Sequence, residues 1–249
     1  MPDLWIIKPK PLYNADVKLL CFPYAGGGSP IYFPWKNKLG SNVELNIVQA
    51  PGRGTHFSQD PIDNMGELVE SLLPKVSEIL NGNYMIYGHS LGSRVGFELV
   101  RQAMAKGFPA PLHFFASGSA SPKRKCTEKK TYELPDDEFI DVLNDMNGTP
   151  REISENRELM ALFLPTLRAD FKIAEQYACH EKFVIPSKVT VLSGRDDKIS
   201  LEQLQTWGDF FDKSELFMCD GGHFFIDTHR EQVLDIVNKK INDCLCVPA

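Results

Sequence analysis

The pentapeptide GHSLG at residues 88–92 is the feature that most constrains how this chain can fold. It follows a short apolar run at residues 84–87 and precedes a helix-like stretch at residues 91–106. Between a strand and a helix, G-x-S-x-G forms a sharp, strained turn that exposes the serine hydroxyl, and its glycines avoid collisions with both elements. The sequence therefore predicts that Ser90 is a nucleophile at the end of a strand.

A histidine in the C-terminal part of the chain is the candidate general base. The strand-like residues 215–219 are followed by the sequence DGGH at residues 220–223. Two successive glycines allow a tight loop that can bring the imidazole over the serine. We expect His223 to take the proton of Ser90 and to give it later to the leaving group.

The candidate acid lies between these two residues in the chain. Enzymes with a nucleophile in this turn carry their triad in the order serine, acid, histidine, and the acid follows a late strand. Residues 188–193 are such a strand-like run, and the turn after it contains Asp196 and Asp197. Asp197 is preferred because related enzymes usually place the acid three residues after the turn glycine, here Gly194. Asp196 stays open as the alternative.

A glycine-rich loop follows the strand-like residues 17–22, with the sequence PYAGGG at residues 23–28. A phosphate-binding loop is the rival interpretation, because such loops also follow strands. However, no G-K-[ST] follows, the chain contains no G-x-G-x-x-G, and the proline at the start of the loop has no N–H. We expect instead that a backbone N–H of Tyr24 or Ala25 acts with that of Leu91 to stabilise an oxyanion.

With these motifs in one order, the chain resembles the type II thioesterases, the stand-alone editing thioesterases of nonribosomal peptide and polyketide synthases. The resemblance covers nearly all of the chain and rests on five motifs, at residues 21–28, 51–53, 88–92, 165–170 and 221–225.

The resemblance implies an α/β-hydrolase fold with a helical lid, and hydrolysis of acyl thioesters carried on the phosphopantetheine arm of a carrier protein. It also implies that Ser90, Asp197 and His223 form the triad and that no cofactor is needed. One departure is visible: Gly54 follows the Pro-Gly-Arg motif, where members of the family often have Glu. We expect this change to alter the local loop and not the chemistry.

The order of apolar segments favours one α/β domain over residues 1–249. Helix-length stretches separate the strand-like runs, which predicts a mainly parallel sheet with helices on both faces. The runs lie near residues 17–22, 45–49, 84–87, 112–117, 188–193 and 215–219.

The interval at about residues 121–184 breaks this alternation and is the predicted lid insertion. Three helices are expected in it, one beginning near Leu134, one at about residues 155–164 and one at residues 166–177. Arg168 and Asp170 are expected to make structural ion pairs. Five apolar residues are spaced to share one helix face, which either lines an acyl pocket or packs on the core: Leu159, Leu162, Phe163, Leu167 and Phe171.

The formal net charge of −6 argues against nucleic acid as the main partner. A local basic cluster is either a docking site for an acidic carrier protein or a solvated loop: Lys123, Arg124, Lys125, Lys129 and Lys130. No C-x-x-C or H-E-x-x-H sequence indicates a metal site. The chain has no signal-peptide pattern and no apolar run of membrane-spanning length, so a cytoplasmic location is expected. A monomer is expected because it is adequate for the predicted chemistry.

Three other functions stay open at this point. A medium-chain fatty acyl thioesterase of a fatty acid synthase would share the same motifs. A general carboxylesterase or lipase would share the triad. A catalytically silent scaffold that only binds a carrier protein is the alternative from a different class, although such a module has no need for nucleophile, acid, base and oxyanion loop together.

Overall fold

The computed structural model describes residues 5–123, 130–146 and 156–246. Its centre is a seven-stranded sheet with the strand order β1-β3-β2-β4-β5-β6-β7. β1 is antiparallel to β3, and all other neighbouring strands are parallel. The strands are β1 (Ile6–Ile7), β2 (Val17–Phe22), β3 (Val43–Val48), β4 (Tyr84–His89), β5 (His113–Ser117), β6 (Ile185–Gly194) and β7 (Phe211–Cys219).

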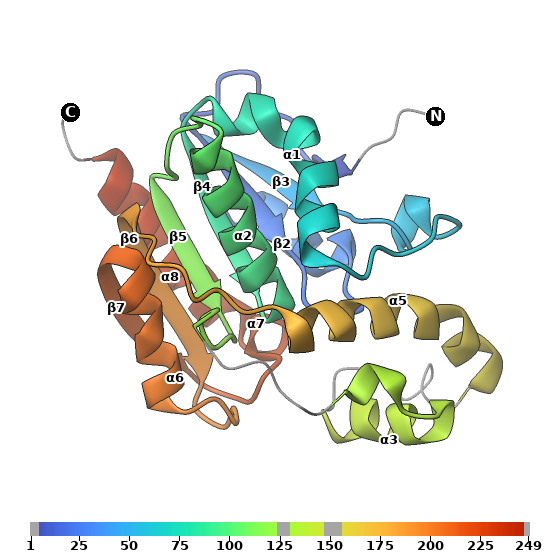
Figure 1. Cartoon of the computed structure of the whole chain (residues 1–249). Helices are drawn as coiled ribbons and strands as arrows, with labels where there is room; N and C mark the ends of the chain where they lie inside the picture. The colour runs from blue at the N-terminus through green and yellow to red at the C-terminus, as the bar shows by residue number, and fades with distance from the viewer. Residues whose placement is uncertain (1–4, 124–129, 147–155, 247–249) are drawn as a thin grey trace.

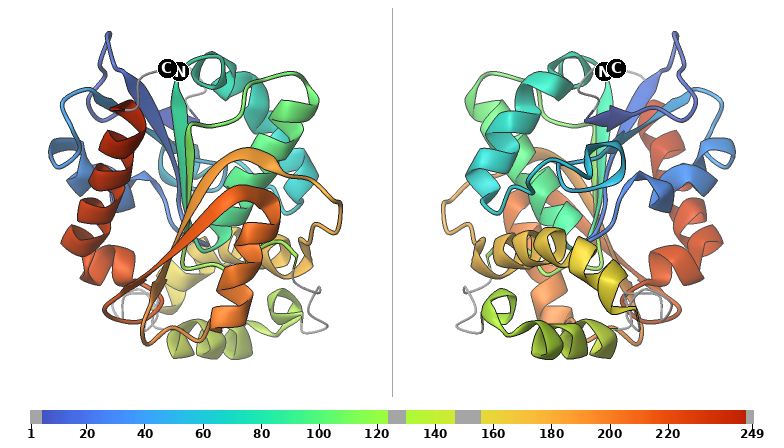
Figure 2. Two further views of the ribbon diagram at one scale, coloured as in Figure 1. Left: turned by 90° about the vertical axis from the view of Figure 1, so that its left-hand side faces the viewer. Right: turned by 90° about the vertical axis from the view of Figure 1, so that its right-hand side faces the viewer.

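Helices cover both faces of this sheet, with α1 and α2 on one face and α8 on the other (Figures 1 and 2). The α-helices are α1 (Met65–Leu80), α2 (Leu91–Ala105), α3 (Asp136–Asp145), α5 (Arg157–Gln176), α6 (Leu201–Gln205), α7 (Phe225–Thr228) and α8 (Arg230–Leu245). Short 3-10 helices are η1 (Ser29–Asn37), η2 (Gly54–His56), η3 (Thr131–Glu133) and η4 (Thr206–Phe210). The predicted α/β class is therefore confirmed.

The central strands are buried on both faces, which explains their continuous apolar sequence. Every residue of β3, β4 and β5 is buried. A parallel sheet covered by helices on both sides shows such runs instead of an alternating pattern. Two separate cores result, one between the sheet and α1 and α2, the other between the sheet, η1 and α8.

A third, smaller core lies beyond the carboxyl ends of the strands, where α3 and α5 pack together (Figure 1). The expectation of two helices at about 155–164 and 166–177 is wrong, because the structure has one continuous helix, α5, with Pro165 inside it. A proline in a helix interior costs about 3 kcal/mol. Four apolar side chains on both sides of the proline are buried and offset that cost: Met160, Leu164, Leu167 and Ile173.

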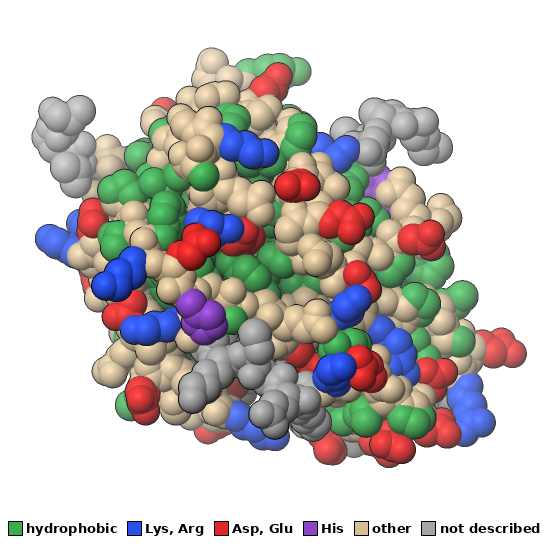
Figure 3. Space-filling view, in the orientation of Figure 1, with side chains coloured by type: hydrophobic (Ala, Val, Ile, Leu, Met, Phe, Trp, Pro, Cys, Tyr) green, Lys and Arg blue, Asp and Glu red, His purple; other side chains and the backbone are tan. Residues whose placement is uncertain are grey.

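No helix in the described part of the chain is long and apolar enough to cross a membrane. On the face of the molecule that Figure 3 shows, acidic and basic side chains lie interspersed and do not gather into one basic area.

Candidate active site

Ser90 lies in the turn between β4 and α2, at the carboxyl edge of the sheet. Its φ of 54° and ψ of −118° make it the one non-glycine residue with positive φ in the described part of the chain. Its N–H donates to the carbonyl oxygen of Ser117 at 2.7 Å, and this bond ties the turn to the end of β5. A strained backbone at this place is what a nucleophile elbow requires.

The two glycines of the elbow are needed for close backbone contacts. A Cβ atom on Gly88 would lie 2.4 Å from the carbonyl oxygen of Gly92 and from the backbone of Ser93. One on Gly92 would lie 2.2 Å from the carbonyl oxygen of Phe22, at the end of β2. The reason given by the sequence pattern, that side chains would collide here, is confirmed.

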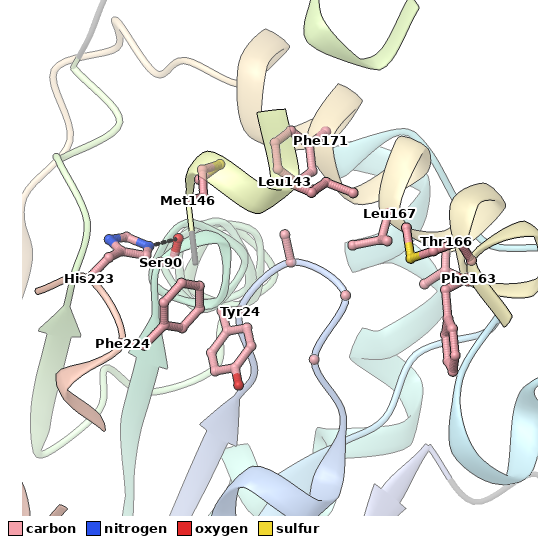
Figure 4. A pocket seen from close by; sticks show the side chains of 14 residues that line it. Tyr24, Ser90, Leu143, Met146, Phe163, Thr166, Leu167, Phe171, His223 and Phe224 are labelled. Atoms are coloured by element: carbon pink, nitrogen blue, oxygen red, sulfur yellow. Dashed lines mark hydrogen bonds between the residues drawn. The ribbon is translucent and has the colours of Figure 1, made fainter. Parts of the chain in front are cut away.

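His223 stands between Ser90 and Asp197. Its Nε2 lies 3.0 Å from the Oγ of Ser90, and its Nδ1 lies 2.8 Å from Oδ2 of Asp197 (Figure 4 shows the contact with Ser90). Asp197 is nearly buried, with 5% of its side chain exposed, whereas Asp196 is exposed. Of the two aspartates that the sequence left open, Asp197 is thus the one that contacts the imidazole.

The environment of Asp197 favours its charged form. Burial alone would raise the pKa of this carboxyl group, but the hydrogen bond and charge of His223 outweigh it and lower the pKa below its ordinary value. The carboxylate can therefore accept a hydrogen bond from Nδ1–H of His223, which leaves Nε2 free to accept the proton of Ser90.

The glycine-rich loop after β2 lines the same pocket as Ser90. The N–H of Gly26 donates to Oδ2 of Asp170 at 2.7 Å, and that of Gly27 donates to the carbonyl oxygen of Tyr24 at 2.9 Å. These bonds occupy two of the donors of the loop. The N–H groups of Tyr24 and Ala25, which precede them, are the donors that the sequence named.

Asp170 joins α5 to this loop, a contact that the sequence did not reveal. Arg53 binds both carboxylate oxygens of Asp170, at 2.8 and 2.9 Å, and also donates to the carbonyl oxygen of Gly27 at 3.2 Å. The carboxylate is 4% exposed. Arg168 instead pairs with Asp136. The expected structural ion pairs therefore exist, and the two residues have different partners.

A second link joins the glycine-rich loop to the loop of the histidine. The hydroxyl of Tyr24 donates to Oδ2 of Asp227 at 3.0 Å, four residues after His223. The ring of Tyr24 also packs edge-on against Phe224, with ring centroids 5.1 Å apart. The two loops that flank the serine are thus held to each other as well as to the sheet.

An apolar cavity of about 210 Å³ opens beside Ser90 and runs between the glycine-rich loop and the helices α3 and α5 (Figure 4). The face of α5 contributes Phe163, Leu167 and Phe171, which is one of the two alternatives that the spacing left open, but Leu159 and Leu162 are exposed. Seven lining residues come from α3, from the residue after it and from α5: Leu143, Met146, Met160, Phe163, Thr166, Leu167 and Phe171. We call this cavity the acyl pocket.

Gly54, the departure from the family pattern, accommodates a neighbouring side chain. Its φ is +55°, and a Cβ atom there would lie 2.4 Å from Oε1 of Gln49. Gln49 uses this position to accept from the hydroxyl of Ser29 at 2.7 Å and to donate to that of Thr55 at 2.9 Å. Hydrogen bonds of Gln49 therefore hold this loop.

The basic cluster is only partly within the described residues. Lys123 pairs with Asp209 at 2.6 Å, and Lys130 pairs with Glu133 at 3.0 Å. Arg124, Lys125 and Lys129 lie outside the described residues. Within the described ranges, no group of three or more His, Cys, Asp and Glu side chains could hold a metal ion.

The chain belongs to the thioesterase family, because the model of the thioesterase domain matches residues 17–241. The chain has the α/β-hydrolase fold of this family. It shares the mostly parallel sheet, the turn that carries Ser90 and the helices over the carboxyl edge of the sheet. The predicted resemblance to type II thioesterases of nonribosomal peptide and polyketide pathways is also confirmed.

Two solved structures are similar over nearly the whole chain. ClbQ from the colibactin NRPS/PKS pathway is 31% identical, with a TM-score of 0.86 over 94% of this chain and all of that chain. The type II thioesterase BorB from the borrelidin biosynthetic cluster is 28% identical, with a TM-score of 0.86 over 95% of this chain and 97% of that one.

Among curated proteins, linear gramicidin dehydrogenase LgrE of Brevibacillus parabrevis is 35% identical over 98% of this chain and 95% of its own length. That printed name describes a dehydrogenase, whereas the domain model that matches this chain is that of a thioesterase.

Proposed function

We propose that this protein is a serine thioesterase that hydrolyses acyl thioesters on the phosphopantetheine arm of carrier proteins. Its task is to remove misprimed or stalled acyl groups in nonribosomal peptide or polyketide biosynthesis. The observation that carries the proposal is the line of contacts from Asp197 through His223 to Ser90, at the mouth of an apolar pocket. Family membership supports the same reaction.

In the proposed mechanism, Ser90 attacks the thioester carbonyl carbon while His223 takes the hydroxyl proton. The N–H of Leu91, at the first position of α2, and that of Tyr24 or Ala25 stabilise the tetrahedral oxyanion. The carbon–sulfur bond then breaks, and the thiolate receives the proton from His223. His223 then deprotonates a water molecule, which attacks the carbonyl carbon of the acyl-serine ester. The bond between this carbon and Oγ of Ser90 breaks, His223 returns the proton to Oγ, and the free acid leaves.

The acyl pocket supports a substrate with an apolar chain. Its volume is about 210 Å³, far above the minimum of roughly 10–15 Å³ that a single water molecule needs. Among the described residues that line it, none is Asp, Glu, Lys or Arg. A neutral acyl group of short to medium length therefore fits, and a carboxylated or cationic group would be buried without a counter-charge.

We further propose that α3 and α5 belong to a lid, within one hydrolase domain over residues 1–249. Their position over the pocket supports this role, since a lid excludes water and shapes the acyl site. The contacts from Asp197 to Ser90 are complete within a single chain, so a monomer is sufficient for the proposed chemistry. The cytoplasm stays the proposed compartment, on the sequence grounds given above.

The test is release of acetyl, butyryl and octanoyl groups from a phosphopantetheinylated carrier protein, compared between the wild type and Ser90→Ala. We expect rapid release by the wild type and a loss of at least about 10³-fold in the variant. Release by Ser90→Ala at the rate of the wild type would refute the nucleophile. Activity on simple esters alone would favour a carboxylesterase, and no release by either protein would favour the scaffold.

A further inference from the structure

His89 occupies the second position of the elbow and is not a member of the triad. Its side chain is completely buried. Three rings surround it, those of Tyr24, Phe225 and His223, with centroids 5.8, 5.2 and 5.5 Å from its own. A polar ring buried beside the base must find partners for both of its nitrogen atoms.

The hydrogen bonds of His89 fix which nitrogen carries the proton. Its Nε2 lies 2.9 Å from the carbonyl oxygen of His223, and since a carbonyl only accepts, Nε2 is the donor. Its Nδ1 is then an acceptor, 2.9 Å from the Oγ of Ser117.

The hydroxyl of Tyr87 completes this arrangement. It donates to the Oγ of Ser117 at 2.9 Å, so that the serine proton is available for Nδ1 of His89. Three hydrogen bonds therefore run in one direction, from Tyr87 on β4 to the backbone of His223. Every donor and acceptor in this chain of hydrogen bonds has a partner only when the ring of His89 carries its proton on Nε2.

The surroundings of His89 preserve its neutral form. Burial, and after it the charge of His223, lower the pKa of His89 from its ordinary value of 6.5 to about 3. The charge of Asp197 acts in the opposite direction but does not compensate. Protonation of Nδ1 would also replace an acceptor by a donor and disrupt the bond from Ser117.

The backbone next to His89 leaves a slot for the ring. Gly118, after β5, has a φ of +56°, and a Cβ atom there would lie 2.7 Å from Cε1 of His89. The N–H of Gly118 donates to the carbonyl oxygen of Leu192 at 2.8 Å, which holds this turn against β6. The position of the ring is therefore set by the sheet itself.

We propose that His89 is a positioning residue, which holds the peptide carbonyl of His223 so that the imidazole contacts both Ser90 and Asp197. The loop that it holds starts with Gly221 and Gly222, and Gly221 has a φ of +88°. Glycines give such a loop conformational freedom, and a buried donor at the next carbonyl removes it. This inference rests on the proposed function, in which His223 is the base.

Two substitutions separate the hydrogen bond from the packing. His89→Met fills the slot without a donor, whereas His89→Gln can place an amide N–H near the position of Nε2. Because misplacing a reacting group by 1 Å can cost about 10²-fold, we expect His89→Met to lower kcat by about 10- to 100-fold with KM changed less than about twofold. His89→Gln is expected to recover most of kcat.

Nuclear magnetic resonance can detect the hydrogen bonds of the two histidines, which a loss of packing alone would not change. In the ¹⁵N-labelled wild type, we expect His89 in the Nε2–H form between about pH 5 and 8, and a far-downfield proton on Nδ1 of His223. In His89→Met this proton should shift or broaden through exchange, and in His89→Gln it should persist.

The proposal is overturned if His89 is found in the Nδ1–H form, or if a folded His89→Met protein keeps the kcat and downfield proton of the wild type. It is also overturned if His89→Gln, folded as judged by its melting temperature, loses as much kcat as His89→Met. A wild type that releases no acyl group would refute the proposed function instead, and the spectra would still decide the role of His89.

Discussion

The two aspartates after β6 differ in burial and contact although they are neighbours in the chain. Asp197 contacts His223 at 2.8 Å, whereas Asp196 is exposed. Replacing Asp197 by Asn removes the charge and permits the wrong imidazole tautomer, and we expect kcat to fall by about 10³- to 10⁴-fold. Steady-state release of an acyl group from the carrier protein at pH 7.5 measures this effect.

Asp196→Asn is the matched control, since it removes the same charge one residue away. We expect its kcat to stay within about twofold of the wild type, because an exposed carboxylate next to the turn is screened by solvent. Equal losses in the two variants, with the fold intact by circular dichroism, would contradict the assignment of Asp197.

At the residue scale, the sequence predicted those roles that depend on local pattern. Ser90 and its glycines form one continuous motif, and the place of Asp197 follows from a short spacing after a strand. The role of Asp170 could not be predicted, because its partner Arg53 lies 117 positions away and the sequence does not show which charges meet. His89 gave no signal either, since its position in the motif tolerates many residue types.

The helix α5 shows how packing can outweigh local propensity. Pro165 predicted a break between two helices, yet the apolar face continues through it and packs against α3 and the glycine-rich loop. The two-residue strand β1 was also missed, because a run this short carries no periodicity. Long buried strands, by contrast, were predicted to within a few residues.

The carboxylate of Asp170 is the point at which α5 holds the glycine-rich loop. Asp170→Asn weakens its contacts with Arg53 and with the N–H of Gly26. Breaking a buried pair costs about 3–5 kcal/mol, and we expect a loss in the unfolding free energy toward the lower end of this range, together with a fall in kcat. Urea denaturation and acyl release measure the two effects.

Asp136→Asn serves as the control for this prediction, since it also removes an aspartate that pairs with an arginine. Asp136 is 67% exposed, and an exposed pair contributes about 0–1 kcal/mol. A kcat for Asp170→Asn equal to that of Asp136→Asn would mean that α5 does not position the glycine-rich loop.

Phe163 on α5 closes the part of the acyl pocket that lies farthest from Ser90 in Figure 4. Its ring packs edge-on against Phe57, with centroids 6.0 Å apart. Phe163→Ala would lengthen the pocket, and one additional methylene in an apolar site is worth about 1–3 kcal/mol. We therefore expect the ratio of kcat/KM for dodecanoyl over octanoyl carrier protein to rise at least about tenfold.

Leu162→Ala controls for a general loosening of the helix, because Leu162 is adjacent but 54% exposed and does not line the pocket. Its dodecanoyl to octanoyl ratio should equal that of the wild type. If Phe163→Ala shows this same ratio, Phe163 does not limit the length of the acyl chain.

At the scale of the whole molecule, two buried histidines make the unfolding free energy depend on pH between about pH 6.5 and 4. Burial lowers the pKa of His89 to about 3 and that of His113 to about 4, against an ordinary value of 6.5. Between about pH 6.5 and 4, the unfolded chain therefore binds protons that the folded chain does not. The unfolding free energy must fall as the pH falls through this window.

Each histidine that stays neutral only in the folded state contributes a slope approaching about 1.4 kcal/mol per pH unit at pH values well below 6.5. Asp197, Glu44, Glu98 and Glu215, whose pKa values are lowered, also lose their stabilising effect as the pH falls from the ordinary range of carboxyl groups toward the lowered values. The interval between about pH 6.5 and 5 thus reports mainly on the two histidines.

Urea denaturation at pH 7, 6, 5 and 4.5 tests this prediction. The quantity to compare is the change in unfolding free energy per pH unit, not its absolute value. His89→Gln should flatten the decline in unfolding free energy by about half, because it removes one of the two titrating groups. His180→Gln, at an exposed position, should leave the decline unchanged. If the wild type and His89→Gln lose stability in parallel, then His89 is not held neutral in the folded protein, and the chain of hydrogen bonds that ends at His223 would have a different proton arrangement.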